Sequence, residues 1–131
     1  MGRKSWESLP PRFRPLPNRT NAVVSRNADF SAEGAHVFSN LQSAIDEART
    51  LQAEKIFIIG GAQIYRQAIE EKLVDEMYLT HVNGSFDDAD VFFPVIEESN
   101  WHIQEIGRFD ADLNNEFSGR FLHYTKNSVK F

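Results

Sequence analysis

An apolar run followed by two glycines constrains the fold of this chain more than any other feature. Residues 55 to 59 read Lys-Ile-Phe-Ile-Ile, which is apolar on both faces of an extended backbone, and Gly60 and Gly61 follow. Beyond the glycines, apolar side chains recur at helical spacing, at Ile64, Tyr65, Ala68, Ile69 and Leu73. A strand that is apolar on both faces is typical of a parallel sheet covered by helices. The pattern therefore predicts an α/β fold.

The remaining patterns predict a second helix and several more strands. Apolar residues from Leu41 to Leu51 repeat at helical spacing, and the spacing of Ser39 and Gln42 is that of a capping box, so we expect a helix over about 40–52. Short strands are expected at 21–25 and 34–38, and a longer one at 77–82. Residues 101–109 and 119–126 read as an antiparallel pair. The proline-rich residues 9–19 read as an ordered loop or a linker, and no repeat or second domain is evident, so we expect residues 1–131 to form a single domain.

Composition excludes several classes of function. Lysine and arginine number 14 against 19 aspartates and glutamates, so no basic stripe is available for nucleic acid. There is no cysteine, and the four histidines lie far apart, so no metal site is expected. The polar start lacks the apolar core of a signal peptide, and the run at 56–59 is far shorter than the roughly 20 residues that span a bilayer. We expect a cytoplasmic protein without a membrane partner.

Two clusters have the composition of a phosphate-binding site. At Gly60 and Gly61, backbone amides can approach an anion, and the start of the following helix adds partial positive charge. Gly2 to Ser5 supplies a flexible backbone, two cations and a hydroxyl. Each cluster also has a plainer interpretation, as a tight turn and as a solvated chain end. Neither decides the function separately.

Five segments in chain order carry a resemblance to a known family: 1–9 (MGRKSWESL), 14–21 (RPLPNRTN), 58–65 (IIGGAQIY), 78–81 (YLTH) and 90–94 (DVFFP). Together they resemble the dihydrofolate reductases, and bacterial members most closely. The resemblance implies an α/β fold with a mixed, mostly parallel central sheet, flanking helices and a C-terminal antiparallel strand pair. It also implies a function, the NADPH-dependent reduction of 7,8-dihydrofolate to tetrahydrofolate in one-carbon metabolism, with antifolates as inhibitors.

In the family, a hydride passes from the nicotinamide to C6 of the pterin while N5 gains a proton. The resemblance implies that Arg3 lies near the 2′-phosphate that distinguishes NADPH from NADH, and that Tyr65 lies beside the nicotinamide. The cofactor-binding residues that it implies are Gly2, Arg3, Lys4, Ser5, Ser25, Arg26, Gly60, Gly61, Ala62, Gln63, Ile64 and Tyr65.

On the substrate side, the resemblance implies that Arg19 grips the α-carboxylate of the glutamate tail, where a planar guanidinium fits two oxygens at once. It implies that Leu9, Leu16 and Ile59 surround the aromatic rings. Thr80 matches a threonine that hydrogen-bonds the catalytic carboxylate. Without the resemblance, these residues read as an ordinary loop arginine, apolar core residues and a strand threonine.

The chain starts at the methionine of the family's M-G-R motif, so we expect it to lack the family's first strand, mobile loop and first helix. That helix carries the carboxylic acid that assists pterin protonation. No acid of this chain has a positional claim to replace it, since Asp46 and Glu47 are expected on a helix face. We therefore assign no catalytic acid, treat Thr80 and Tyr65 as supporting residues, and expect marginal stability and slow turnover.

Two other functions stay open. The second interpretation, after the reductase, is a non-catalytic complementation fragment, or dinucleotide-binding piece, that needs an N-terminal partner segment. It also has some likeness to reductases of related fold that act on a pyrimidine intermediate of riboflavin synthesis. The Arg19 loop and the segment 78–81 argue against that last alternative.

Overall fold

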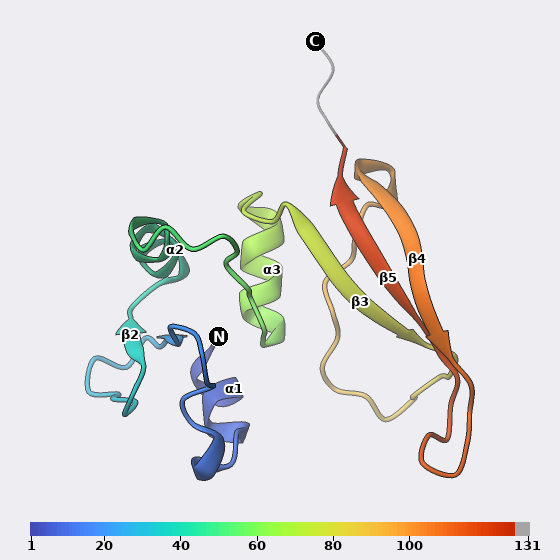
Figure 1. The fold of residues 1–131 in the computed structure, drawn as a ribbon, viewed down its shortest axis with the longest axis horizontal. Helices are drawn as coiled ribbons and strands as arrows, with labels where there is room; N and C mark the ends of the chain where they lie inside the picture. Colours follow the sequence, from blue (N-terminus) through green and yellow to red (C-terminus); the bar gives the residue numbers. More distant parts are fainter. Residues whose placement is uncertain (128–131) are drawn as a thin grey trace. The chain divides into compact units, whose positions relative to one another are not determined.

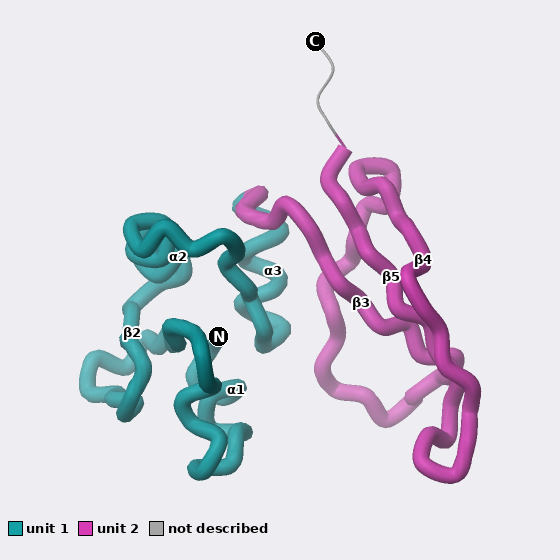
Figure 2. The backbone as a smooth tube through the Cα atoms, viewed as in Figure 1, with its two compact units in different colours: residues 1–71 teal, residues 72–131 magenta. Residues whose placement is uncertain are grey.

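The structure, a computed structural model, describes residues 1–127, and they fall into two compact units. The first unit is Met1–Glu71, and the second begins at Lys72 and holds the remaining described residues, 72–127 (Figure 2). Within residues 1–127, no helix is both long enough and apolar enough to cross a membrane.

The first unit combines helices with a short parallel sheet. Its elements are α1 (Arg3–Ser8), the 3-10 turn η1 (Pro11–Phe13), β1 (Ala22–Val24), β2 (His36–Phe38), α2 (Leu41–Thr50) and α3 (Ala62–Glu70) (Figure 1). β1 and β2 pair in parallel, with Ala22 opposite His36. The buried apolar side chains of this unit come from all of its layers: Trp6, Val23, Leu41, Ala44, Ile45 and Ala68. Of the apolar faces that the spacing predicts, α2 buries Leu41, Ala44 and Ile45, and α3 buries Ala68.

The second unit is an antiparallel sheet of the order β3-β5-β4. Its elements are β3 (Glu76–Val82), the 3-10 turn η2 (Glu98–Asn100), β4 (Trp101–Phe109) and β5 (Gly119–Lys126) (Figure 1). Met77, Leu122 and Tyr124 are buried in it. The antiparallel pairing predicted for 101–109 and 119–126 is confirmed, with a register shift between Glu105 and Gly107.

The α/β class is confirmed, but the strand expected at residues 55–59 is wrong. In the described part of the chain this segment is not paired into either sheet, and Phe57 and Ile59 are 66% and 46% exposed. A strand exists only where a neighbouring strand accepts its backbone hydrogen bonds. The apolar pattern therefore marks a segment suited to burial, while the pairing that would make it a strand is absent. The strands form two separate sheets rather than one.

The start of α2 also differs from the capping box that we expected. The helix begins at Leu41, and the residue that caps it is Asn40, whose Oδ1 accepts a hydrogen bond of 2.8 Å from the Ser43 amide. Gln42 donates to Asp46 instead of reaching back to the chain at Ser39. Asparagine is at least as good an N-cap as serine, so the helix is capped by Asn40 rather than by Ser39, one residue earlier.

Candidate functional site

Three chain segments of the first unit meet around Gly2. The Gly2 amide donates a hydrogen bond of 2.8 Å to the Gly60 carbonyl, and the Val24 amide donates one of 2.9 Å to the Met1 carbonyl. Gly2 and Val24 also form a parallel bridge. Because Met1–Gly2 and β1 run in the same direction, the residues after Gly2 and those after Val24 lie at the same edge, the carboxyl ends of the two segments. In open α/β folds, that carboxyl edge is where ligands bind.

The glycine turn packs against Ser5. Gly60 has a φ of +126°, which L residues with a side chain rarely adopt, and a Cβ there would lie 3.2 Å from the Ser5 Oγ and 3.8 Å from the Tyr65 Oη. A Cβ on Gly61 would lie 3.6 Å from the same Ser5 oxygen. Gly2 to Ser5 and the glycine pair Gly60–Gly61, which the sequence left as two separate clusters, therefore lie together. We call this site, with the start of α3, the cradle.

The start of α3 completes this cradle. Gly61 is the N-cap residue and supplies no capping side chain, and the first turn contains no acid. The amides at the start of a helix have no partner within the helix, and the helix dipole favours an anion there. Ala62, Gln63 and Ile64 carry these amides. The backbone fits a phosphate group, since glycine leaves room for close approach at Gly60 and Gly61.

Cations and hydroxyls surround the cradle. Arg3 and the exposed Lys4 follow Gly2, and the nearly buried Ser25 and exposed Arg26 follow β1 at the same edge. Arg3 forms an exposed ion pair of 3.8 Å with Glu7, of the kind that contributes little to stability and yields readily to a ligand.

Tyr65 lies one turn into α3. Burial raises the pKa of its hydroxyl, so the phenol is neutral near pH 7. Its hydroxyl faces Gly60 across the position where a Cβ would stand. The side chain therefore presents a neutral polar group to the glycine turn.

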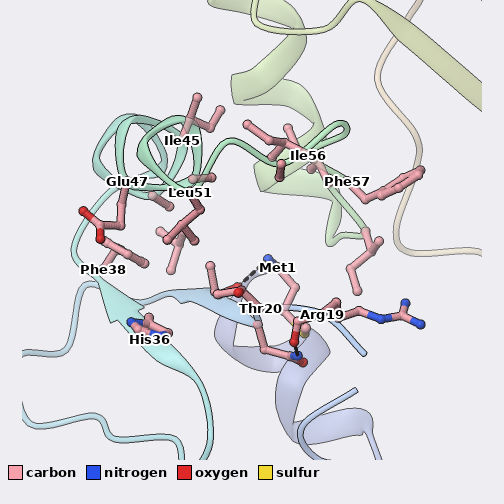
Figure 3. A pocket seen from close by; sticks show the side chains of 18 of the residues that line it. Met1, Arg19, Thr20, His36, Phe38, Ile45, Glu47, Leu51, Ile56 and Phe57 are labelled. Atoms are coloured by element: carbon pink, nitrogen blue, oxygen red, sulfur yellow. Dashed lines mark hydrogen bonds between the residues drawn. The ribbon is translucent and has the colours of Figure 1, made fainter. Parts of the chain in front are cut away.

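A cavity of about 680 Å³ opens beside the cradle, within the first unit. Apolar residues of α2 and of segment 55–59 form part of its wall, and Figure 3 shows Ile45 and Leu51 on one side of it and Ile56 on another. Leu16, Arg19 and Ile59, all predicted to bind substrate, line it. A cavity of this size and apolar character suits a drug-sized aromatic ligand.

Sequence reasoning missed part of this wall. Glu47 lines the cavity although we expected it only on a helix face, and Thr20, Asn21, His36 and Phe38 also contribute. The signal for Glu47 was its position three residues after Ala44, on the same side of α2. The short strands gave no comparable signal, because three residues are too few to show an alternating pattern.

Two predicted substrate residues are not among those that line the cavity. Leu9 is the C-cap of α1 and is not among the residues that line the cavity. Thr80 lies on β3 of the second unit, where it is exposed and pairs with Phe121. The structure thus brings together Leu16, Arg19 and Ile59 and leaves the roles of Leu9 and Thr80 as predictions.

Comparison with known proteins identifies the family. The sequence model described as dihydrofolate reductase matches residues 1–126. The chain belongs to the dihydrofolate reductase family. It is 41% identical over 127 residues to the dihydrofolate reductase of Neisseria meningitidis serogroup A, with 96% of this chain and 73% of the relative covered. The dihydrofolate reductase of Bacillus subtilis is 37% identical over 131 residues, with 99% and 73% covered.

A longer relative shows the same similarity. A putative bifunctional dihydrofolate reductase-thymidylate synthase of Oryza sativa is 39% identical over 109 residues, which is 78% of this chain and 22% of that relative. As a member of the dihydrofolate reductase family, the chain is of the oxidoreductase class, and its family reaction is dihydrofolate reduction with a nicotinamide cofactor. These matches confirm the family that the sequence motifs predicted.

Proposed function

We propose that this chain binds NADPH in the glycine cradle and reduces 7,8-dihydrofolate to tetrahydrofolate in the adjoining cavity. The contact of Ser5 with the Gly60 turn, at the uncapped start of α3, carries the proposal. NADPH, when bound, supplies the hydride. The chain's own part is to hold the cofactor's phosphates, to orient the substrate and to keep water from the rings.

The cradle residues divide by the part of NADPH that they would hold. The amides of Ala62, Gln63 and Ile64 and the Ser5 hydroxyl would hold the pyrophosphate. Arg3, Lys4, Ser25 and Arg26 follow two neighbouring parallel segments and supply the cations and hydroxyl that suit the 2′-phosphate. Tyr65 would lie beside the nicotinamide, with its neutral phenol toward Gly60.

The cavity residues would hold the folate. Leu16 and Ile59 line it as walls for the aromatic rings, and Leu9 is proposed as a further wall residue. The Arg19 Nε donates a hydrogen bond of 2.8 Å to the Pro17 carbonyl, which leaves the two terminal nitrogens for a carboxylate. Thr80 is proposed to orient the carboxylate that assists protonation.

That carboxylate is not assigned to any residue of this chain. Met1 and Gly2 hydrogen-bond to β1 on one side and to Gly60 on the other, and residues along both flanks line the cavity. This arrangement suits an extended segment that enters the cavity ahead of Met1. We propose that such an N-terminal segment supplies the acid, and that the 131 residues by themselves turn over slowly.

The first test concerns the cofactor. Replacing Arg3 by alanine is expected to weaken NADPH binding about tenfold or more while NADH changes within about twofold, because only NADPH carries a 2′-phosphate. Dissociation constants from fluorescence titration measure this. Arg12→Ala is the matched control, since Arg12 is exposed and stacks on Phe13. Equal losses for both cofactors would refute the assignment of Arg3.

The second test concerns the substrate tail. Arg19→Lys keeps the charge but removes the planar fork, so the dissociation constant of dihydrofolate is expected to rise about tenfold. That of 7,8-dihydropteroate, which ends at the benzoate, should change little. Arg12→Lys serves as the control. An equal change for the two ligands would show that Arg19 does not contact the glutamate.

A further inference from the structure

The side chain of Asn21 closes the loop that carries Leu16 and Arg19. Asn21 is 4% exposed. Its Oδ1 accepts a hydrogen bond of 2.9 Å from the Leu16 amide, and its Nδ2 donates to the carbonyls of Leu16 at 2.9 Å and Arg19 at 3.2 Å. One side chain thus satisfies three backbone groups of the loop at the cavity wall. A buried amide with these partners fixes the path of the chain between them.

Further hydrogen bonds hold the rest of the loop. The Asn21 carbonyl accepts a hydrogen bond of 2.9 Å from the His36 amide, which fastens the loop's end to β2. Asn18 has a φ of +60°, a left-handed conformation that asparagine tolerates better than most residues. The Arg19 Nε donates to the Pro17 carbonyl at 2.8 Å. Arg19 is therefore held at its own carbonyl by Asn21 and at its guanidinium by the loop.

We propose that Asn21 is a positioning residue that determines specificity for the glutamate tail by holding the Arg19 guanidinium ready for a carboxylate. The inference rests on the proposed function of Arg19. An exposed arginine on a free loop loses much rotamer entropy when it pairs with a ligand, and preorganisation removes part of that loss. Asn21 supplies this preorganisation through its side-chain hydrogen bonds to the backbone of Leu16 and Arg19.

The test compares two ligands that differ only in the glutamate, 7,8-dihydrofolate and 7,8-dihydropteroate. Asn21→Asp keeps the acceptor for the Leu16 amide but replaces the donor by a carboxylate oxygen that faces two carbonyls. We expect this variant to lose about tenfold of the wild-type preference for dihydrofolate, with dihydropteroate binding changed within about twofold. Asn83→Ala, which removes an exposed amide bonded to Ser118 in the second unit, is the matched control and should keep the preference.

Two further variants keep the inference testable if Asn21→Asp fails to fold. Asn18→Val forces a β-branched residue into the left-handed conformation at an exposed position, and it should reduce the same preference. In an Arg19→Ala background, Asn18→Val or Asn21→Asp should lower the preference no further, because both act through Arg19. NADPH binding, which depends on other residues, reports whether each variant is folded.

The outcomes separate this inference from the proposed function. A wild-type chain that binds both ligands equally would overturn the role of Arg19, and the role of Asn21 with it. If the wild type and the Arg19→Ala variant differ as expected but the loop variants keep the full preference, only the inference on Asn21 is overturned. Losses from Asn21→Asp and Arg19→Ala that simply add would likewise overturn the inference on Asn21 alone.

Discussion

Mixing the chain with a peptide that supplies the N-terminal strand and acid-bearing helix of a dihydrofolate reductase is expected to raise the rate of dihydrofolate reduction by about 10² to 10⁴. This is the usual contribution of a positioned general acid, and no residue assigned to the site provides one. The backbone arrangement suits such a peptide. Met1 hydrogen-bonds to β1 and Gly2 to Gly60, and the cavity is lined by residues of both β1 and segment 55–59. The NADPH-dependent loss of dihydrofolate absorbance measures the rate.

The matched control is the same peptide with its carboxylic acid replaced by the amide. It should bind and stabilise the chain, as seen in a raised unfolding midpoint, but restore little of the rate. This comparison separates completion of the fold from completion of the chemistry. A chain that is cooperatively folded and fully active without any peptide would contradict the account of the catalytic acid.

The sequence predicted the elements whose signals are local. The apolar spacing at 41–51 gave α2, that after Gly61 gave α3, and the alternation at 101–109 and 119–126 gave an antiparallel pair. These elements satisfy most of their hydrogen bonds internally or with a neighbour close in the chain. Residues 55–59 carry an equally strong apolar pattern, yet they are not a strand, because pairing depends on a partner elsewhere.

The residues of the candidate site also differ in whether their sequence signal is local. Gly60, Gly61 and Gly2 to Ser5 were predicted from their composition and from the family motifs, and the structure adds that the Ser5 hydroxyl lies where a Cβ on either glycine would meet it. Asn21 gave no signal beyond its place in a matching segment. Its importance lies in hydrogen bonds to Leu16 and Arg19 whose geometry depends on the whole loop, and a single asparagine has too many common uses for sequence to select this one.

Replacing Gly60 by alanine is expected to weaken NADPH binding at least about a hundredfold. The φ of +126° is strained for alanine, at a cost of about 1–3 kcal/mol, and the new Cβ would lie 3.2 Å from the Ser5 Oγ. Relief of that strain has to move the Gly60 carbonyl, which accepts the 2.8 Å bond from Gly2, or the Ser5 hydroxyl. Either movement opens the cradle at the phosphates. Isothermal titration with NADPH measures the loss.

Gly34→Ala provides the matched control for this last prediction, because it introduces comparable strain away from the cradle. Gly34 has a φ of +83°, and a Cβ there would lie 2.8 Å from the Pro15 ring. Gly34→Ala should therefore lower the free energy of unfolding in urea at least as much as Gly60→Ala, but only Gly60→Ala should lose NADPH affinity in the folded state. Gly61→Ala should have a smaller effect than Gly60→Ala, since its φ is −89° and its Cβ would meet the Ser5 oxygen at 3.6 Å. If Gly34→Ala and Gly60→Ala weaken NADPH equally, the loss reflects general destabilisation, and the glycine turn does not form the phosphate site.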